Sequence, residues 1–150
     1  MAFWLMKSDV EDYTIDQLKR DGRTDWVGVR NYQARNFMRD QMNDGDLAFF
    51  YHSNAEPSGI AGIMRIVGPS KPDLTQFDRK SIYFDEKATK ESPRWFLREV
   101  EFVKKVSFFS LDQIRKLPEC KKMLVLQKGT RLSITPVTQT EWNAILKAFD

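Results

Sequence analysis

Cysteine and histidine are almost absent from this chain, which holds one of each, Cys120 and His52, among its 150 residues. A single cysteine excludes a disulfide within the chain, and one cysteine with one histidine cannot assemble a zinc site of the Cys/His kind. No EF-hand spacing of carboxylates is present either. The sequence therefore predicts a protein that needs no metal and no other cofactor.

Long apolar runs are lacking as well. The apolar stretch at residues 2–6 is far shorter than the roughly 18 residues that a membrane-spanning helix needs, and it follows no basic leader. We expect a cytoplasmic protein with no membrane partner. Because domains usually hold roughly 100–200 residues, we also expect residues 1–150 to form one domain, and a monomer.

The glycine-rich loops that hold phosphates in common nucleotide-binding folds are missing. Neither Gly-x-x-x-x-Gly-Lys-Ser/Thr nor Gly-x-Gly-x-x-Gly occurs in the chain. Gly59 and Gly62 do form a Gly-x-x-Gly, but it lies between two predicted strands rather than between helices. A KH-type phosphate clamp is therefore not supported, and close backbone packing is the better explanation of these glycines.

The only histidine is followed by a serine, which raises the question of catalysis. His52 and Ser53 end a predicted strand, where successive side chains point to opposite faces, and no Gly-x-Ser-x-Gly elbow surrounds the serine. Three interpretations stay open: a nucleophile with its base, a half-buried histidine that hydrogen-bonds its own loop, and polar atoms presented to a ligand at the mouth of a strand. The first lacks the required geometry, so we expect no enzyme.

Positive charge is concentrated in two stretches, although the net charge is only +3. Residues 19–39 carry six Lys/Arg against two Asp, and residues 115–131 carry six against one Glu. Such clusters indicate either a phosphate-facing surface or solvated helix faces. The phosphate-binding candidates are Arg35, Arg39, Lys121, Lys122, Lys128 and Arg131.

The most informative segment runs from Asp25 to Asn36. It sets Trp26 among small residues, arginines and carboxamides, just before a helical pattern begins. This combination suits stacking on a base, hydrogen bonds to its edge and charge for a phosphate. The alternative for Trp26 is an ordinary core tryptophan; Trp4 and Trp142 fit the core better, and Trp95 fits either role.

Periodicity and capping boxes give the order of elements. They predict strands near 3–7, 47–52, 60–67 and 94–106, and helices near 14–20, 34–42, 110–117 and 138–149. Trp26 is expected in a loop, residues 68–94 in a long surface excursion, and residues 123–126 and 131–137 on either side of a turn at Gly129. Without a regular βαβ repeat, the order favours an α+β fold whose mixed or antiparallel sheet curls into a barrel with helices around it.

Several motifs together resemble an EVE domain. They include Phe3-Trp4-Leu5-Met6-Lys7-Ser8, the run from Trp26 to Asn36, and Phe49-Phe50-Tyr51-His52-Ser53-Asn54. The remaining matches lie at residues 13–18, 57–62, 72–78, 93–95, 131–133, 136–137 and 141–142. The resemblance spans nearly the whole chain and implies a PUA-like pseudo-barrel that is not an enzyme.

The resemblance also implies a ligand and a site. EVE domains are thought to bind modified cytosines in DNA or modified nucleotides in RNA in an aromatic-lined pocket. Carried over by motif, the residues around that pocket are Lys7, Ser8, Trp26, Arg30, Asn31, His52, Ser53, Trp95 and Ser133. The alternative is a small-molecule binder or an unrecognised enzyme that uses the same pocket. Salt separates the two, because only polynucleotide binding weakens steeply as salt is added.

Overall fold

The computed structural model describes residues 1–129 and 131–149. Its centre is a mixed sheet of six strands in the order β2-β5-β4-β3-β1-β6, in which β1 and β3 are parallel and all other neighbours are antiparallel. The strands are β1 (Phe3–Asp9), β2 (Arg23–Trp26), β3 (Leu47–Ser53), β4 (Gly59–Pro72), β5 (Phe96–Ser110) and β6 (Ile134–Val137).

In the part of the chain that the structure describes, eight short helical segments lie around this sheet. The α-helices are α1 (Ile15–Asp21), α2 (Tyr32–Asn36), α3 (Leu111–Arg115) and α4 (Gln139–Ala148); a π-helix, η1 (Phe37–Gln41), and three 3-10 helices, η2 (Leu74–Phe77), η3 (Pro118–Cys120) and η4 (Leu124–Leu126), complete them. Thr14, Ser110 and Thr138 each form the predicted capping box. No helix in the described part of the chain is long and apolar enough to cross a membrane.

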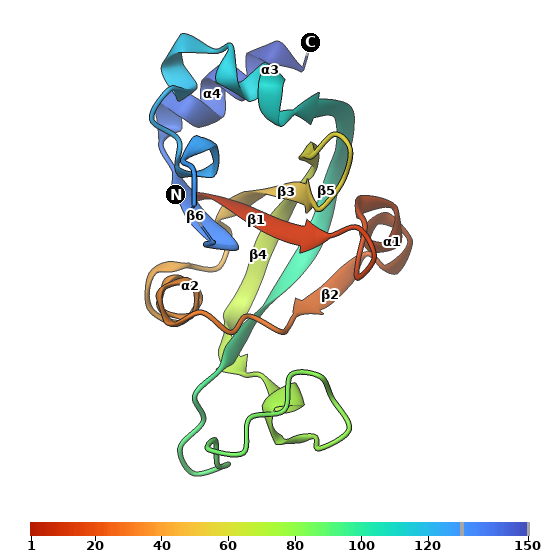
Figure 1. The fold of residues 1–150 in the computed structure, drawn as a ribbon, viewed down its shortest axis with the longest axis vertical. Coiled ribbons are helices and arrows are strands. Elements are labelled where there is room, and N and C mark those ends of the chain that lie inside the picture. The colour runs from red at the N-terminus through yellow and green to blue at the C-terminus, as the bar shows by residue number, and fades with distance from the viewer. Residues whose placement is uncertain (130, 150) are drawn as a thin grey trace.

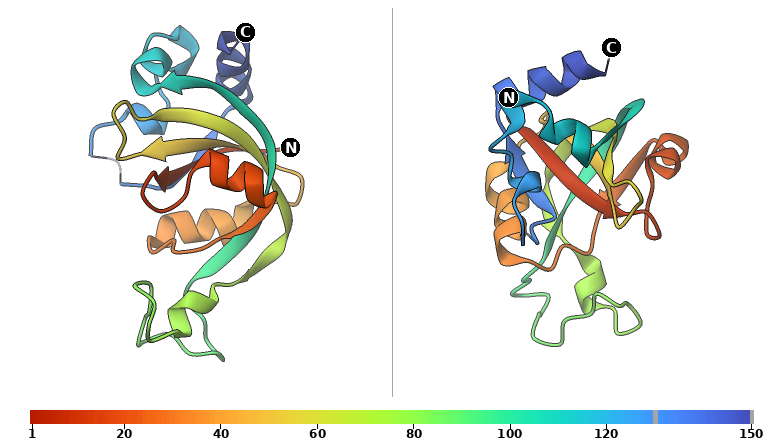
Figure 2. Two further views of the ribbon diagram at one scale, coloured as in Figure 1. Left: turned by 90° about the vertical axis from the view of Figure 1, so that its right-hand side faces the viewer. Right: turned by 45° about the horizontal axis from the view of Figure 1, so that its top comes forward.

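The predicted α+β class with a mixed sheet and helices around it is confirmed. The sheet curves strongly, as Figure 2 shows, but it does not close, because β2 and β6 are its two edges. The central strands are buried on both faces. In β3, Phe50 belongs to one core and Phe49 and Tyr51 to the other, which explains the nearly continuous apolar run of this strand.

Different helices cover the two cores. Ile15 and Leu18 of α1 and Met38 of η1 pack into the core that contains Phe50, whereas Ile114 of α3 and Trp142 of α4 pack into the other. In Figure 1, α3 and α4 therefore lie at one end of the molecule, and the excursion between β4 and β5 lies at the opposite end.

Three expectations need correction. Trp26 is not in a loop but ends β2, an edge strand that the sequence analysis missed because only four residues, two of them charged, form it. The helix predicted over residues 34–42 is a short α-helix that continues as a π-helix. The excursion is shorter than expected, because β4 extends to Pro72 and η2 follows it.

Candidate nucleic-acid interface

A cavity of about 690 Å³ opens where β1 and β2 end. Its volume lies within the range of roughly 300–1,000 Å³ that is typical of ligand pockets. Residues from four segments of the chain line it: Lys7, Ser8, Asp9, Glu11, Asp12 and Tyr13; Thr24, Asp25, Trp26, Val27, Gly28, Val29, Arg30 and Asn31; Ile82 and Tyr83; Arg131 and Ser133.

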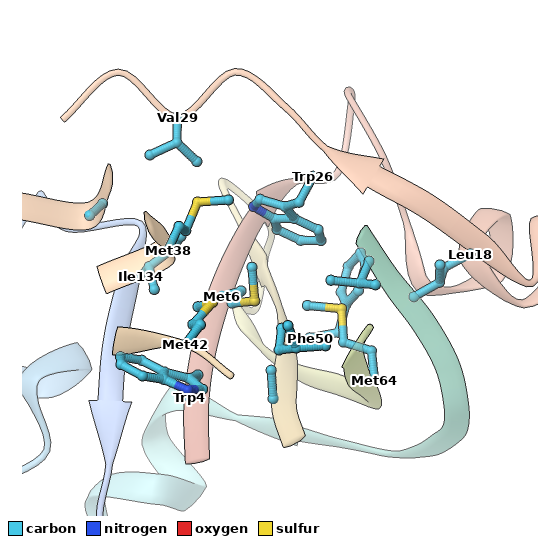
Figure 3. Close-up of a cluster of buried hydrophobic side chains, with 14 of the residues drawn as sticks. Trp4, Met6, Leu18, Trp26, Val29, Met38, Met42, Phe50, Met64 and Ile134 are labelled. Carbon is cyan, nitrogen blue, oxygen red and sulfur yellow. The ribbon is translucent and has the colours of Figure 1, made fainter. Parts of the chain in front are cut away.

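Trp26 is both a core residue and a wall of this cavity. Its exposed fraction is 8%, and its ring lies edge-on to Phe50 with 5.5 Å between the ring centroids. Figure 3 shows the indole between the loop that carries Val29 and the buried side chains of Met6 and Phe50. The core packing fixes the orientation of the ring, and the remaining surface faces the cavity.

The loop after Trp26 is locked against the excursion. Gly28 has a φ of +84°, and a β-carbon at this position would lie 2.6 Å from the Tyr83 ring, so only glycine lets the ring approach. Its amide donates to Asp73 Oδ2 at 2.8 Å. Arg30 adds an ion pair to Asp73 at 3.1 Å and donates twice to the carbonyl oxygen of Tyr83, at 2.8 and 3.2 Å. Arg30 is therefore largely engaged within the protein.

Two buried polar side chains order the excursion itself. Asp73 is completely buried and accepts from the Thr75 amide in addition to its bonds with Gly28 and Arg30. Gln76, also completely buried, donates to the carbonyl oxygens of Asp73 and Trp95 and accepts from the amides of Arg94 and Trp95. Because satisfied buried networks rigidify a segment, the excursion forms a fixed wall of the cavity.

Lys7 and Ser133 are neighbours in the lining of the cavity. The Lys7 amide donates to the Ser133 carbonyl oxygen at 2.8 Å, next to the pairing of β1 with β6. The Lys7 ammonium lies 5.9 Å from the centroid of the Tyr51 ring, and burial lowers the pKa of this lysine. Lys7 lines the cavity, and its half-buried ammonium lies over Tyr51, a residue of the core that does not contain Trp26.

The polar side chains differ in what they still offer a ligand. The Ser8 hydroxyl already donates to the Tyr13 carbonyl oxygen at 2.8 Å, so it remains an acceptor. Asn31 caps α2, because its Oδ1 accepts from the Ala34 amide at 3.0 Å. The Nδ2 amide group of Asn31 therefore remains to donate to a ligand. Lys7 and Asn31 are two side chains of the lining that can donate.

Carboxylates are as prominent as cations in the wall. The lining contains the carboxylates of Asp9, Glu11, Asp12 and Asp25 together with Lys7, Arg30 and Arg131, and Arg30 is already paired with Asp73. Asp9 accepts from Asn54 and from the Glu11 amide, and these bonds lower its pKa. The cavity is therefore poorly suited to a phosphate and better suited to a group that carries both donors and acceptors.

His52 and Ser53 are not among the described residues that line the cavity. Nε2 of His52 accepts from the Ile15 amide at 3.2 Å, so the histidine satisfies the first turn of α1, and burial lowers its pKa. Ser53 is paired with Asp9 across β1 and β3, one strand away from the cavity wall. The histidine is half-buried, as the second interpretation expects, but its hydrogen bond comes from the Ile15 amide of α1 and not from its own loop.

Trp95 lines a neighbouring cavity of about 520 Å³ instead. Its indole N–H donates to Asp85 at 2.7 Å, its ring stacks on Tyr32, and the Arg30 guanidinium lies 5.3 Å from the ring centroids of both Trp95 and Tyr83. The two cavities share Arg30, Ile82 and Tyr83 as a common wall. Trp95 thus supports the site indirectly, through Arg30.

The phosphate-binding candidates are dispersed. Arg131 lines the cavity, whereas Lys121 and Lys122 follow η3 at the end of the molecule that carries α3 and α4 (Figure 1). Lys128 is exposed. Arg35 donates to the Arg94 carbonyl oxygen, and Arg39 forms an ion pair with Asp40 at 2.8 Å that raises the pKa of the arginine. Arg39 is thus locally neutralised.

The sequence analysis missed Tyr13, Tyr83 and the carboxylates of the wall. Tyr13 precedes the capping box of α1. Desolvation, reinforced by the hydrogen bond that its hydroxyl donates to Asp21, raises the pKa of Tyr13 to about 12. Tyr83 reaches the site from the excursion, where no periodic pattern reports orientation. The short apolar and aromatic run Ile82-Tyr83-Phe84 within a polar stretch was the available signal for Tyr83.

Comparison with known proteins agrees with the motifs. A model of the EVE domain matches residues 2–148. Thymocyte nuclear protein 1 from Homo sapiens is 39% identical over 164 residues, which cover 97% of this chain and 72% of that protein. A crystal structure of a Pseudomonas syringae protein superposes with a TM-score of 0.95 at 43% identity, covering 99% of this chain and 100% of that one.

A further solved structure contains a ligand. Human THYN1 in complex with 5-methylcytosine-containing DNA matches with a TM-score of 0.94 at 38% identity, covering 100% of this chain and 98% of that one. The resemblance drawn from the motifs is confirmed by a match over nearly all residues together with relatives of this similarity, and the chain belongs to the EVE domain family.

Proposed function

We propose that this protein binds nucleic acid and reads a modified cytosine, whose base enters the cavity beside Trp26. The observation that carries the proposal is the composition of the wall, which combines a fixed indole with donors and carboxylates rather than with a cluster of free cations. The similar human protein in complex with 5-methylcytosine-containing DNA supports the ligand class.

The hydrogen-bonding groups of the wall fit a cytosine edge. Cytosine carries an amino donor at N4, which carboxylates accept, and acceptors at N3 and O2. Asp12 or Asp25 supplies the carboxylate, and Lys7 and Asn31 supply the donors. Thymine and uracil place an oxygen at position 4, where a carboxylate repels it. Binding is therefore expected to favour cytosine over thymine.

The apolar part of the wall accommodates the modification. Trp26, Val27 and Val29 provide carbon surface near the polar groups. Burying one methyl-sized group stabilises a complex by about 0.8 kcal/mol, which corresponds to a roughly fourfold preference for 5-methylcytosine over cytosine. A larger preference requires contacts beyond simple burial.

Stacking on Trp26 balances only part of the cost of extrusion. A base stacked on an aromatic side chain gains about 1–3 kcal/mol, and removing a base from a duplex costs a few kcal/mol. The edge contacts and the phosphate contacts therefore supply the remainder. The cations proposed to hold the flanking nucleic-acid backbone are Arg131, which lines the cavity, and Lys128, which precedes it by three residues in the sequence.

We also propose that the protein binds without catalysing a reaction. The lone pair of His52 is occupied by the Ile15 amide, and burial raises the pKa of Cys120 to about 11, which keeps this thiol protonated. Neither residue is available as a base or nucleophile. The expected single domain, monomeric state and cytoplasmic location stay predictions.

Fluorescence anisotropy with labelled oligonucleotides tests the proposal. Matched DNA duplexes carry cytosine, 5-methylcytosine or thymine at one position, and a matched RNA carries 5-methylcytosine. We expect the order 5-methylcytosine, cytosine, thymine, and an affinity that falls steeply with salt. Salt-independent capture of the free nucleoside at equal affinity contradicts the proposal and supports a small-molecule binder.

Variants of Trp26 identify the cavity as the binding site. Trp26→Leu removes the aromatic ring and is expected to weaken binding at least tenfold, whereas Trp26→Phe retains a stacking surface and much of the affinity. Thermal unfolding of both variants shows whether each is folded at the assay temperature. Equal affinity of folded Trp26→Leu and the wild type for 5-methylcytosine contradicts the assignment of the cavity.

A further inference from the structure

We propose that Ile82 is a wedge that enters the base stack of duplex DNA and fills the gap left by the extruded base. This inference rests on the proposed function and deepens it, because it concerns how the base leaves the duplex. The position of Ile82 carries the argument. The side chain is 88% exposed and belongs to the walls of both cavities.

Exposure alone does not distinguish Ile82, since single apolar residues on a surface are common. Leu74, in the same excursion, is 70% exposed but lines neither cavity. Ile82 differs in standing beside the space proposed for the base. Apolar wedges such as isoleucine act by inserting between base steps and unstacking them, which requires this position next to the receiving pocket.

The backbone presents Ile82 on a fixed tip. The amide of Phe84 donates to the carbonyl oxygen of Ser81 at 3.2 Å, which places Ile82 within a four-residue turn. The Ser81 hydroxyl accepts from the Tyr83 amide at 3.0 Å. A wedge needs such support, because a mobile side chain loses conformational entropy when it inserts.

The next residue anchors this tip to the cavity. The Tyr83 carbonyl oxygen accepts two hydrogen bonds from Arg30, and the Tyr83 ring packs on Gly28. The same side chains that fix the Trp26 loop therefore fix the tip, so that wedge and pocket keep a constant separation. This rigid coupling favours a duplex as the partner, in which the vacated position and the extruded base are linked through one backbone.

Paired affinities for single strand and duplex test the inference. Wild type, Ile82→Ala and the control Leu74→Ala are titrated with a 5-methylcytosine oligonucleotide as a duplex and as a single strand. We expect Ile82→Ala to weaken duplex binding about tenfold, to leave single-strand binding within about twofold, and Leu74→Ala to change neither. Ile82→Leu, which keeps an apolar wedge, is expected to retain duplex binding.

A spectroscopic signal follows the insertion directly. 2-Aminopurine beside the 5-methylcytosine brightens when its stack opens, and we expect wild type but not Ile82→Ala to produce this increase in duplex DNA. An Ile82→Ala variant with unchanged duplex affinity, or with equal losses for both forms, overturns the wedge while leaving the proposed function intact. If the wild type shows no preference for 5-methylcytosine in either form, the proposed function itself fails.

Discussion

Gly28 and Tyr83 pack so closely that a β-carbon on the glycine would lie 2.6 Å from the tyrosine ring. This contact joins the loop after Trp26 to the excursion between β4 and β5, two segments more than 50 residues apart in the chain. Both segments contribute walls to the cavity. The geometry of the site thus depends on a position where no side chain is tolerated.

Gly28→Ala is expected to lower both stability and affinity. The substitution strains a backbone with positive φ, at a cost of about 1–2 kcal/mol, and it also displaces the Tyr83 ring. We expect a lower midpoint of thermal unfolding and weaker binding of the 5-methylcytosine duplex. Gly22→Ala is the matched control, because Gly22 has a similar φ of +78° but no atom within 4 Å of the added carbon. This control should lose stability and keep affinity; similar losses of affinity in both variants contradict a role for the Tyr83 contact.

Breaking the ion pair of Asp73 with Arg30 is expected to lower the free energy of unfolding far more than breaking a surface ion pair. Asp73→Asn removes a charge that is completely buried and leaves Arg30 without its ionic partner, which costs about 3 kcal/mol in the free energy of unfolding. Asp40→Asn breaks the exposed pair of Asp40 with Arg39 and should lower the free energy of unfolding far less. Denaturant unfolding of the two variants measures the difference. Equal, small losses in the free energy of unfolding for the two variants would show that the hydrogen bonds from the Gly28 and Thr75 amides to residue 73 hold the excursion without the ion pair.

Lys7→Met is expected to weaken binding of cytosine and 5-methylcytosine by about tenfold or more, since a hydrogen bond to a charged group contributes about 1.5–3 kcal/mol. The slope of affinity against salt should change little, because Lys7 is proposed to read a base. Lys128→Met is the comparison: an exposed lysine that holds phosphate should lower affinity equally for every sequence and reduce the salt slope by about one. Anisotropy titrations at several salt concentrations separate the two behaviours, and a changed slope for Lys7→Met contradicts base reading.

The sequence predicted the central elements well because their signals are local. Three capping boxes mark the starts of α1, α3 and α4, and the apolar run of β3 marks a strand buried on both faces. The motifs around Trp26, Lys7 and Ser133 also reach one cavity. These positions follow directly from strand ends and from the pairing of neighbouring strands.

The parts that escaped prediction depend on contacts between distant segments. β2 is held at the sheet edge by β5, and the excursion is ordered by Asp73 and Gln76, whose bonds to Gly28 and Trp95 join residues 45 and 19 positions apart. No local pattern reports such contacts. His52 illustrates the same limit, because its motif matched the family while its ring nitrogen was committed to the Ile15 amide.

The hydrogen bond from Ile15 to His52 makes stability depend on pH. Burial lowers the pKa of His52 in the folded protein below its ordinary value near 6.5, with Asp16 opposing and Lys105 reinforcing the shift. The unfolded chain therefore binds more protons than the folded one just below pH 6.5, and protonation also destroys the acceptor for the Ile15 amide. The contribution of neutral His52 to the free energy of unfolding is fully present above about pH 6.5 and is lost as the pH falls toward the lowered pKa. We expect the thermal midpoint of the wild type to drop between pH 7.5 and 5.0, and that of His52→Gln, which keeps an acceptor but does not titrate, to drop less. Parallel pH profiles for the two proteins would assign the acid sensitivity to the carboxylates instead.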